Sequence, residues 1–241
     1  MKTIVIIQAR MGSTRLPGKV SQDLAGEPML ARVVNRTRRA QTIDDIVIAT
    51  TTLSPDDVLD QLCLARGWIC YRGSENDVLD RYYQAARKFG ADVIVRITSD
   101  CPLIDPDVID QVVRAFQTEP CVDYASNILP LRTFPRGLDT EVFRFELLER
   151  LWHQDQNPVT REHVTQYIYK HLDEFSTRGV THSKDLSPLR WTVDTPEDLA
   201  FTRKIYEHFS NAVFSWQDVL TLLAEHPDWQ SLNAHIEQKV I

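Results

Sequence analysis

The sequence predicts an α/β protein built on a mostly parallel, doubly wound sheet. Short apolar runs rich in Ile and Val occur at residues 3–7, 45–50 and 92–97, as expected for strands that are buried on both faces. The segments between them carry apolar residues at helical spacing. Strands that alternate with helices are typical of a parallel sheet with helices on both sides. In such sheets, ligands bind where the strands end.

The first half of the chain contains the signals of one more strand and of a helix start. Residues 68–71 predict a short third strand between the runs named above. The segment Ser54-Pro55-Asp56-Asp57 has the cap, proline and acidic residues of a helix start. The helices expected in this half begin after Pro28 and at Ser54, and cover residues 78–89 and 106–117.

The regular alternation breaks after residue 117. Residues 122–127 and 176–182 predict strands, and residues 138–145 alternate polar and apolar side chains, which predicts a half-exposed strand. Residues 189–194 predict a further strand. The helices expected in this half cover residues 145–153, 158–172, 196–209 and 216–224, followed by a short amphipathic tail.

The composition excludes several classes of function. A net charge of -7 argues against a general nucleic-acid binder, which would present a basic face. No apolar run approaches 18 residues, so we expect no membrane span. The four cysteines have no C-x-x-C spacing, which favours reduced thiols. We therefore expect a cytoplasmic protein without a signal peptide.

The length suits one domain with a sizeable core. No linker rich in Gly, Pro or Ser divides the chain, so we expect a single domain over residues 1–241. Within it, residues 124–185 are expected to form an excursion that covers the site or contacts the second subunit of a homodimer.

The segment 8–19, QARMGSTRLPGK, gives the strongest functional signal. Its three cations are Arg10, Arg15 and Lys19. Glycines let backbone N–H groups turn toward a ligand, and fixed positive charges attract anions, so the segment predicts a phosphate-binding loop. It is not a P-loop, because five residues rather than four separate Gly12 from Gly18. The alternative is a basic surface loop with turn-forming glycines.

Two aspartates end predicted strands. Asp100 follows the run 92–97, and Asp194 follows residues 189–193. Carboxylates beside phosphate-binding cations are well placed to hold magnesium between protein and phosphate oxygens. Either aspartate alone is also explained by an Asx turn. The pair predicts a site for one or two metal ions across a triphosphate.

Asp105-Pro106-Asp107 has the D-x-D spacing with which many glycosyltransferases hold a metal. Asp105 is equally suited to cap a helix, Pro106 to occupy the first helical position, and Asp107 to lie near the positive end of the helix dipole. The helix start is the favoured interpretation.

Two other groups of side chains allow more than one interpretation. His163, Tyr167 and His171 follow one another at one-turn spacing, which can line a ligand face or form a solvated stripe. Asp139 and Glu141 lie on the same side of their strand. They could contact sugar hydroxyls, act as a base or face solvent.

The order of motifs resembles that of the cytidylyltransferases that activate acidic sugars, such as 3-deoxy-manno-octulosonate and acylneuraminate cytidylyltransferases. The closer similarity is to the branch of the spore coat polysaccharide biosynthesis protein SpsF. It extends from residue 2 to about residue 206. The motifs are QARMGSTRLPGKV, GSENDVLDRYYQAA, RITSDCPLIDPDVID, REHVTQYIY and RWTVDTPEDLAFTR.

The resemblance implies the fold of the nucleotide-diphospho-sugar transferases, with a single Rossmann-like domain. It also implies Mg²⁺-dependent transfer of CMP from CTP to a sugar, with pyrophosphate leaving. Such chemistry depends on positioning and charge neutralisation. The sugar would be an acidic, ulosonic one for a surface polysaccharide. The alternatives are a glycosyltransferase that uses a nucleotide-sugar donor and a non-catalytic nucleotide-binding protein.

The resemblance implies site residues as well. The catalytic residues would be Arg10, Arg15, Lys19 and Asp100, and the Mg²⁺ ligands Asp100 and Asp194. The nucleotide would be bound by Gln8, Ala9, Arg10, Gly12, Ser13, Arg15, Lys19, Thr98 and Ser99, with its base in a pocket formed by Arg72, Gly73, Ser74 and Asp77. The candidates for contact with the sugar are Asn127, Asp139 and Glu141.

Overall fold

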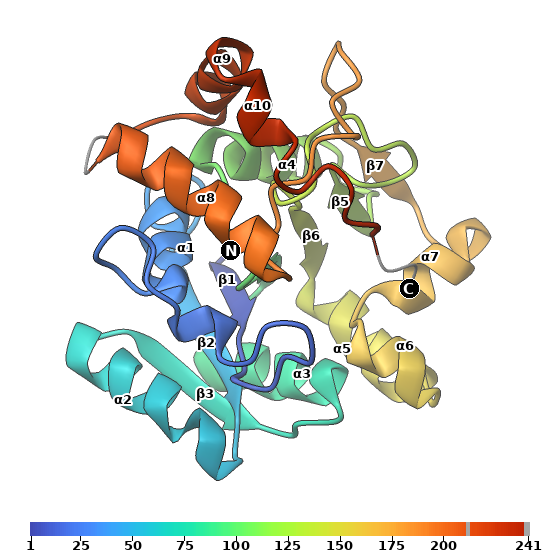
Figure 1. The fold of residues 1–241 in the computed structure, drawn as a ribbon. Coiled ribbons are helices and arrows are strands. Elements are labelled where there is room, and N and C mark those ends of the chain that lie inside the picture. Colours follow the sequence, from blue (N-terminus) through green and yellow to red (C-terminus); the bar gives the residue numbers. More distant parts are fainter. Residues whose placement is uncertain (211–212, 239–241) are drawn as a thin grey trace.

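The computed structural model describes residues 1–210 and 213–238 of the chain. This part contains a seven-stranded sheet in the order β3-β2-β1-β4-β6-β5-β7 (Figure 1). The strands are β1 Thr3–Gln8, β2 Asp45–Thr51, β3 Ile69–Gly73, β4 Val93–Thr98, β5 Tyr124–Ser126, β6 Glu141–Arg144 and β7 Thr177–Gly179. β6 is antiparallel to β4 and β5, and the other pairs are parallel. The predicted mostly parallel α/β sheet is confirmed.

Helices cover both faces of the sheet. The α-helices are α1 Met29–Thr37, α2 Asp57–Arg66, α3 Val78–Phe89, α4 Pro106–Thr118, α5 Phe145–Gln154, α6 Pro158–Glu162, α7 Gln166–Lys170, α8 Pro196–Phe209, α9 Trp216–Glu225 and α10 Pro227–Gln230. Short 3₁₀ turns are η1 Lys19–Ser21, η2 Ser54–Asp56 and η3 Leu172–Glu174. One core cluster joins the sheet to α1, α4, α8 and α9, and a second joins it to α3, α5 and α7.

The central strand β1 shows why this sequence forms a two-sided sheet. Val5 and Ile7 belong to the first core cluster, whereas Ile4 and Ile6 belong to the second. Successive side chains of a strand point to opposite faces, so an uninterrupted apolar run fills both cores. Gln8 continues the series of Ile4 and Ile6. Its side chain therefore emerges on the face that α3 covers.

The parallel strands β1 to β4 end at one edge of the sheet. The segments that follow β1, β3 and β4 begin there, which brings together residues 9–19, 74–77 and 99–105. This is the edge at which α/β sheets bind ligands. The functional segments predicted from the sequence thus share one rim.

The single helix predicted over residues 158–172 is wrong. The chain forms α6 and α7 separately, with a break at residues 163–165. Val164 lies in the break with φ of 58° and is fully buried. The Thr165 hydroxyl donates a hydrogen bond to Glu141 Oε2 (2.5 Å). A continuous helix over these residues would lose this hydrogen bond and the burial of Val164.

The break also removes the predicted stripe of His163, Tyr167 and His171. His163 lies in the break, and the other two lie after it. The rings of Tyr167 and His171 stack with their centroids 4.0 Å apart. The three side chains therefore do not share one helical face.

Two strand predictions need correction in the second half of the chain. Residues 189–194 form no strand in the described structure, and only an isolated bridge pairs Arg190 with Arg136. The strand predicted as half-exposed over residues 138–145 is the shorter β6, whose residues Glu141, Val142 and Phe143 are buried. It lies between β4 and β5, where both of its faces are covered. Alternation alone cannot reveal such a central position.

Residues 124–185, which the sequence predicts as an excursion, contribute β5, β6 and β7 to the same sheet and add α5, α6 and α7. Contact of this region with a second subunit stays a prediction. None of the described helices combines the length and the apolar character that crossing a membrane requires.

Candidate active site

Most of the predicted site residues come together around one cavity of about 560 Å³. We call it the rim cavity, because it lies at the carboxyl ends of β1 and β4. The predicted residues that line it are Gln8, Ala9, Arg10, Gly12, Ser13, Arg15, Lys19, Thr98, Ser99, Asp100 and Asp194. Its other lining residues are Thr14, Val20, Val78, Arg81, Glu162 and His163.

A buried carboxylate anchors the cationic loop that follows β1. Asp56 is 3% exposed and accepts hydrogen bonds from the Met11 backbone N–H (2.6 Å) and from the Thr51 hydroxyl. The backbone N–H of Gly18 donates to Met11 O (3.0 Å), with Gly18 at φ of 68°, a conformation that favours glycine. The sequence explained Asp56 as a helix-start residue, but its side chain caps no helix. It anchors the loop that follows β1.

Lys19 lies at the centre of the charged part of the rim cavity. Its Nζ donates to Asp194 Oδ1 (2.8 Å), to Asp100 Oδ2 (3.2 Å) and to the carbonyl oxygen of Val193 (2.9 Å). Arg15 approaches the same pair, with its Nη2 3.0 Å from Asp194 Oδ2. Two of the three predicted cations, Lys19 and Arg15, thus contact the predicted metal ligands, whereas Arg10 pairs with Glu162 (3.4 Å).

Lys19 and Asp100 are both charged at neutral pH. Burial lowers the pKa of Lys19, but Asp100 and Asp194 more than offset it and raise that pKa above its ordinary value. Burial raises the pKa of Asp100, but the Lys19 ammonium and the hydrogen bond from the Thr98 hydroxyl (2.5 Å) bring it down to about 2. The cavity therefore holds two carboxylates and two cations within ion-pair distance.

Asp194 owes its position to the start of α8. The Asp198 carboxylate accepts the backbone N–H groups of Asp194 (2.9 Å) and Thr195 (3.1 Å), as part of a capping box. The Arg190 Nη2 group donates to Asp194 Oδ2 (3.0 Å) and to Asp198 Oδ2 (2.9 Å). Arg190 thus orients both carboxylates.

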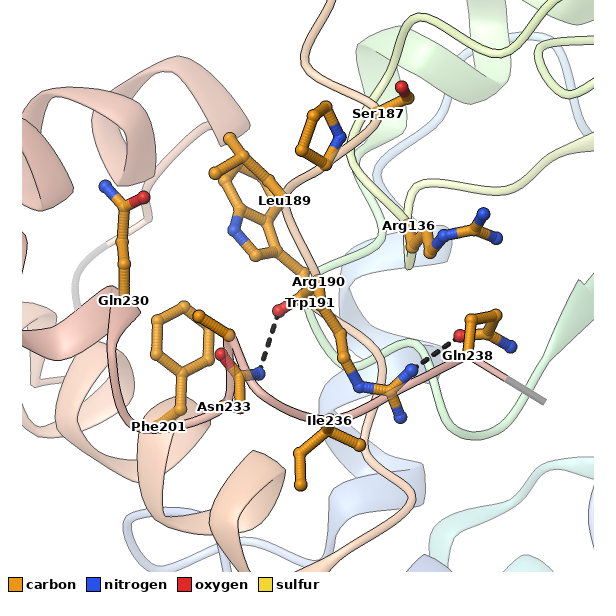
Figure 2. Close-up of a pocket in the computed structure, with 12 residues that line it drawn as sticks. Arg136, Ser187, Leu189, Arg190, Trp191, Phe201, Gln230, Asn233, Ile236 and Gln238 are labelled. Atoms are coloured by element: carbon orange, nitrogen blue, oxygen red, sulfur yellow. Dashed lines mark hydrogen bonds between the residues drawn. The ribbon is translucent and has the colours of Figure 1, made fainter.

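A second cavity, of about 380 Å³, lies beside Arg190 (Figure 2). The segment after α10 forms one of its walls. From it, Asn233 Nδ2 donates to Arg190 O (3.0 Å), and Gln238 Oε1 accepts from Arg190 Nη1 (2.5 Å), as the dashed lines in Figure 2 mark. None of the predicted site residues lines this cavity, and the charge of Arg190 is already paired with Asp194 and Asp198. The predicted site residues therefore point to the rim cavity rather than to this one.

The four residues expected around the base do not line the rim cavity. Arg72 is turned toward α2, where its Nη2 donates to Asp57 (2.6 Å). Ser74 Oγ accepts the backbone N–H of Asp77 (3.1 Å), and Asp77 caps α3 and pairs with Arg161 (2.8 Å). A side chain at Gly73 would meet Arg81 and Tyr71, at 3.1 and 2.9 Å from its Cβ. Their place around the base stays a prediction.

Arg81 also lines the cavity, although no predicted site motif contains it as a site residue. It is 2% exposed, and its Nη1 donates to Ser74 O (2.7 Å), while its Nε has no partner among the described residues. Burial lowers the pKa of this guanidinium below its ordinary value. The signal that could have revealed it is a lone arginine between Val78 and Tyr82 on the apolar face of α3. A buried arginine without a carboxylate partner suits an anionic ligand.

The three candidates for sugar contact line neither cavity. The Asn127 amide bridges Leu138 O and the Thr140 backbone N–H (2.7 and 2.9 Å), which ties β5 to the chain before β6. Asp139 forms a two-pronged ion pair with Arg132. Glu141 is buried and accepts hydrogen bonds on both carboxylate oxygens. A direct contact of these residues with a sugar stays a prediction.

The donor set at the rim suits magnesium. No group of three or more His, Cys, Asp or Glu side chains forms a cation site in the described part of the chain. Asp100 and Asp194 make a pair, since both contact the same ammonium group. Mg²⁺ is commonly bound by one or two carboxylates, with phosphate oxygens and water completing its octahedron. The pair therefore suits an Mg²⁺ ion whose remaining coordination positions would be filled by phosphate oxygens of a nucleotide and by water.

The D-x-D segment has no such role. Asp105 is 1% exposed, pairs with Arg36 (3.2 Å) and accepts the backbone N–H groups of Asp107 (3.0 Å) and Trp216 (2.9 Å). These hydrogen bonds engage both of its carboxylate oxygens, and the N–H of Asp107 belongs to the first turn of α4. The interpretation as a helix start is confirmed.

Comparison with known proteins gives a consistent result. A family model described as Cytidylyltransferase matches residues 4–219. The spore coat polysaccharide biosynthesis protein SpsF of Bacillus subtilis is 33% identical over 93% of this chain and 95% of its own. An uncharacterized protein of Methanocaldococcus jannaschii is 35% identical over 99% of this chain and 97% of its own. The 3-deoxy-manno-octulosonate cytidylyltransferase of Trichlorobacter lovleyi is 38% identical, over 50% of this chain and 47% of its own.

Solved structures share the fold. A cytidylyltransferase from Leptospira borgpetersenii matches with a TM-score of 0.92 and 32% identity, over 100% of this chain and 99% of its own. A CMP:2-keto-3-deoxy-manno-octonic acid synthetase in complex with CTP matches with a TM-score of 0.67 and 18% identity, over 86% of this chain and 99% of its own. At that identity, the second match speaks for the fold alone.

Proposed function

The chain belongs to the cytidylyltransferase family of nucleotidyltransferases, and on this premise we propose that it transfers CMP from CTP to an acidic sugar with release of pyrophosphate. The observation that carries the proposal is the contact of Lys19 with Asp100 and Asp194 at the end of the cationic loop. The cluster offers cations for a triphosphate and carboxylates for a metal in one cavity.

The proposed reaction forms one P–O bond and breaks another. A sugar hydroxyl attacks the α-phosphorus and gives its proton to water, the bond from this phosphorus to the bridging oxygen breaks, and pyrophosphate leaves. Arg15 and Lys19 would bind the phosphates, and Asp100 and Asp194 would hold Mg²⁺. The ion would neutralise negative charge on the phosphate oxygens. Arg81, which the structure adds to the site, would provide a further positive charge.

The identity of the sugar is proposed from the relatives. SpsF is named for the biosynthesis of a spore coat polysaccharide, and the octulosonate enzymes act on an ulosonic acid. We therefore propose an ulosonic acid as the acceptor and a surface polysaccharide as its destination. We also propose that the protein works in the cytoplasm as a homodimer, and light scattering on the purified protein tests the dimer.

The activity is tested by incubating the protein with CTP, MgCl₂ and a panel of ulosonic acids, and by measuring pyrophosphate. We expect release that depends on both CTP and one of the sugars. Release that is no greater with any sugar, although CTP binds, would indicate a non-catalytic nucleotide-binding protein. Transfer from a ready-made nucleotide sugar without pyrophosphate would indicate a glycosyltransferase.

The matched variants are Asp100→Asn and Asp107→Asn. Asp100 lines the rim cavity, whereas Asp107 lies exposed in the first turn of α4. We expect Asp100→Asn to lower the rate of pyrophosphate release by a factor of about 100 or more. Asp107→Asn should keep the rate within about twofold. The reverse order would contradict the proposed metal site.

A further inference from the structure

Gln8 lines the rim cavity, and the orientation of its side-chain amide is fixed by a neighbouring arginine. Its Oε1 accepts a hydrogen bond from Arg96 Nη2 (3.3 Å). A guanidinium group has only donors, so the amide atom that faces it must be the oxygen. The Nε2 group is then the part of the amide that Gln8 can present to a ligand.

Arg96 is itself held by a buried carboxylate. It lies on β4, and its Nη1 donates to Glu141 Oε1. Burial lowers the pKa of Arg96, but Glu141 more than offsets this and raises that pKa above its ordinary value. The guanidinium therefore remains a charged donor to Gln8 over the working range of pH.

The second oxygen of Glu141 is fixed by three hydroxyl groups. Its Oε2 accepts hydrogen bonds from Tyr124 (2.8 Å), Thr165 (2.5 Å) and Tyr169 (2.9 Å). Glu141 is 2% exposed, so rotating its carboxylate would leave several buried groups without partners. Arg96, Tyr124, Glu141, Thr165 and Tyr169, which we call the Glu141 network, hold the amide of Gln8 in one orientation.

Gln8 lies on the face of β1 that α3 covers. Its side chain emerges on the same face of β1 as Ile4 and Ile6, which pack with Val78 in the second core cluster. Val78 and Ala9 also line the rim cavity and give it apolar surface. Such surface suits the flat ring of a nucleotide base better than its phosphates.

Cytosine and uracil differ at N3, an atom to which the amide of Gln8 could form a hydrogen bond. Cytosine presents two acceptors, N3 and O2, whereas uracil carries a proton on N3. We propose that Gln8, oriented by the Glu141 network, selects cytosine over uracil in the bound nucleotide. Its N–H donors match N3 of cytosine and oppose the N–H of uracil, and Arg96 prevents the amide flip that would accommodate uracil. The inference rests on the proposed function, because it takes the rim cavity to bind CTP.

Binding of CTP and UTP, measured by calorimetry with MgCl₂ and no sugar, tests this inference separately from the transfer reaction. We expect the wild-type protein to prefer CTP by about tenfold or more. Gln8→Met keeps the length of the side chain but has no donor, and should bring the two affinities to within about threefold. Gln8→Glu presents only acceptors to the base, and should reverse the preference.

The Glu141 network is tested by Tyr169→Phe, which removes one of the three hydroxyl donors, and by Arg96→Met. Both should lower the preference for CTP while retaining binding of the triphosphate. Tyr83→Phe is the matched control, because its hydroxyl donates to Glu149 outside the cavity (3.0 Å). It should leave the preference unchanged. Thermal unfolding of each variant confirms that the measured protein is folded.

Three results would overturn the inference. The wild-type protein could bind CTP and UTP equally. Gln8→Met and Gln8→Glu could retain the wild-type preference in the calorimetric measurement. In the transfer assay, the two variants could change only the KM for the sugar, which would place Gln8 against the acceptor. Absence of binding by either nucleotide would instead contradict the proposed function itself.

Discussion

Lys19 shows how a single residue combines structural and functional roles. Its ammonium contacts two carboxylates and a backbone carbonyl, so it balances charges that would otherwise repel each other at the rim. The same position puts a cation beside the expected path of the leaving pyrophosphate. Charge and spacing in the sequence predict the cation, but only the structure shows its partners.

For Lys19→Ala we expect the affinity for CTP to fall by roughly tenfold to a hundredfold, and the affinity for CMP to fall much less. The reason is that the ammonium would bind the β- and γ-phosphates, which CMP lacks. Calorimetry with both nucleotides measures the difference. Arg114→Ala, which removes an exposed cation on α4, is the control. Equal losses for CTP and CMP would contradict this placement of Lys19.

Asp100 makes the stability of the protein depend on acidity. Its pKa is about 2 in the folded protein, below its value in an unfolded chain, so its stabilising contribution is complete above about pH 5. We expect roughly 2 kcal/mol of it to disappear between about pH 4 and pH 2. Urea unfolding of wild-type protein and Asp100→Asn across this range measures the effect. A pH profile that is identical in the two proteins would refute this coupling.

At the scale of elements, the loop after β1 owes its shape to a residue far along the chain. The Asp56 carboxylate holds Met11 and Thr51, and thereby fixes the loop of residues 9–19 against the end of β2. Helix-start patterns predict an aspartate at this position equally well. The sequence cannot distinguish the two roles, because both place an acidic residue after a proline.

Asp56→Ala should lower the free energy of unfolding by about 2–3 kcal/mol, because it leaves a buried backbone N–H and a buried hydroxyl without their acceptor. It should also weaken CTP binding through the displaced loop. Denaturant unfolding and calorimetry measure the two effects. Asp57→Ala, which removes an exposed partner of Arg72, should cost less than about 1 kcal/mol. A cost at Asp57 as large as at Asp56 would argue against the anchoring role.

At the scale of the whole molecule, the segment after α10 returns to the site. In Figure 1 this red segment runs from α10 in the direction of α7. Asn233, buried within it, donates to Arg190 O and to Asp198 Oδ1, both at 3.0 Å. Since Arg190 and Asp198 position Asp194, the C-terminal segment supports the proposed metal site.

Asn233→Ala should destabilise the protein by about 1–3 kcal/mol and lower the affinity for Mg²⁺ in the presence of CTP. Urea unfolding and titration of MgCl₂ measure the two effects. Gln230→Ala is the control, since Gln230 lines the same second cavity but its side chain makes one long hydrogen bond in the described structure, to Leu223 O (3.4 Å). Unchanged Mg²⁺ dependence in Asn233→Ala would separate this segment from the site.

The sequence by itself determined the first four strands, the helices between them and the cationic loop. These features are local: a run such as Ile4–Ile7 is apolar on both faces in any context, and parallel strands bring their ends to one edge. The approach of Lys19 to Asp100 follows from this topology, because β1 pairs with β4.

The tertiary structure decided what depends on distant partners. It placed β6 in the middle of the sheet and broke the helix at Val164. Glu141, for which the sequence left sugar contact, a role as a base and solvent exposure open, is a buried partner of Arg96. It also buried Arg81 at the rim cavity. The physical reason is that a buried polar group is defined by the groups that satisfy its hydrogen bonds, and these lie elsewhere in the chain.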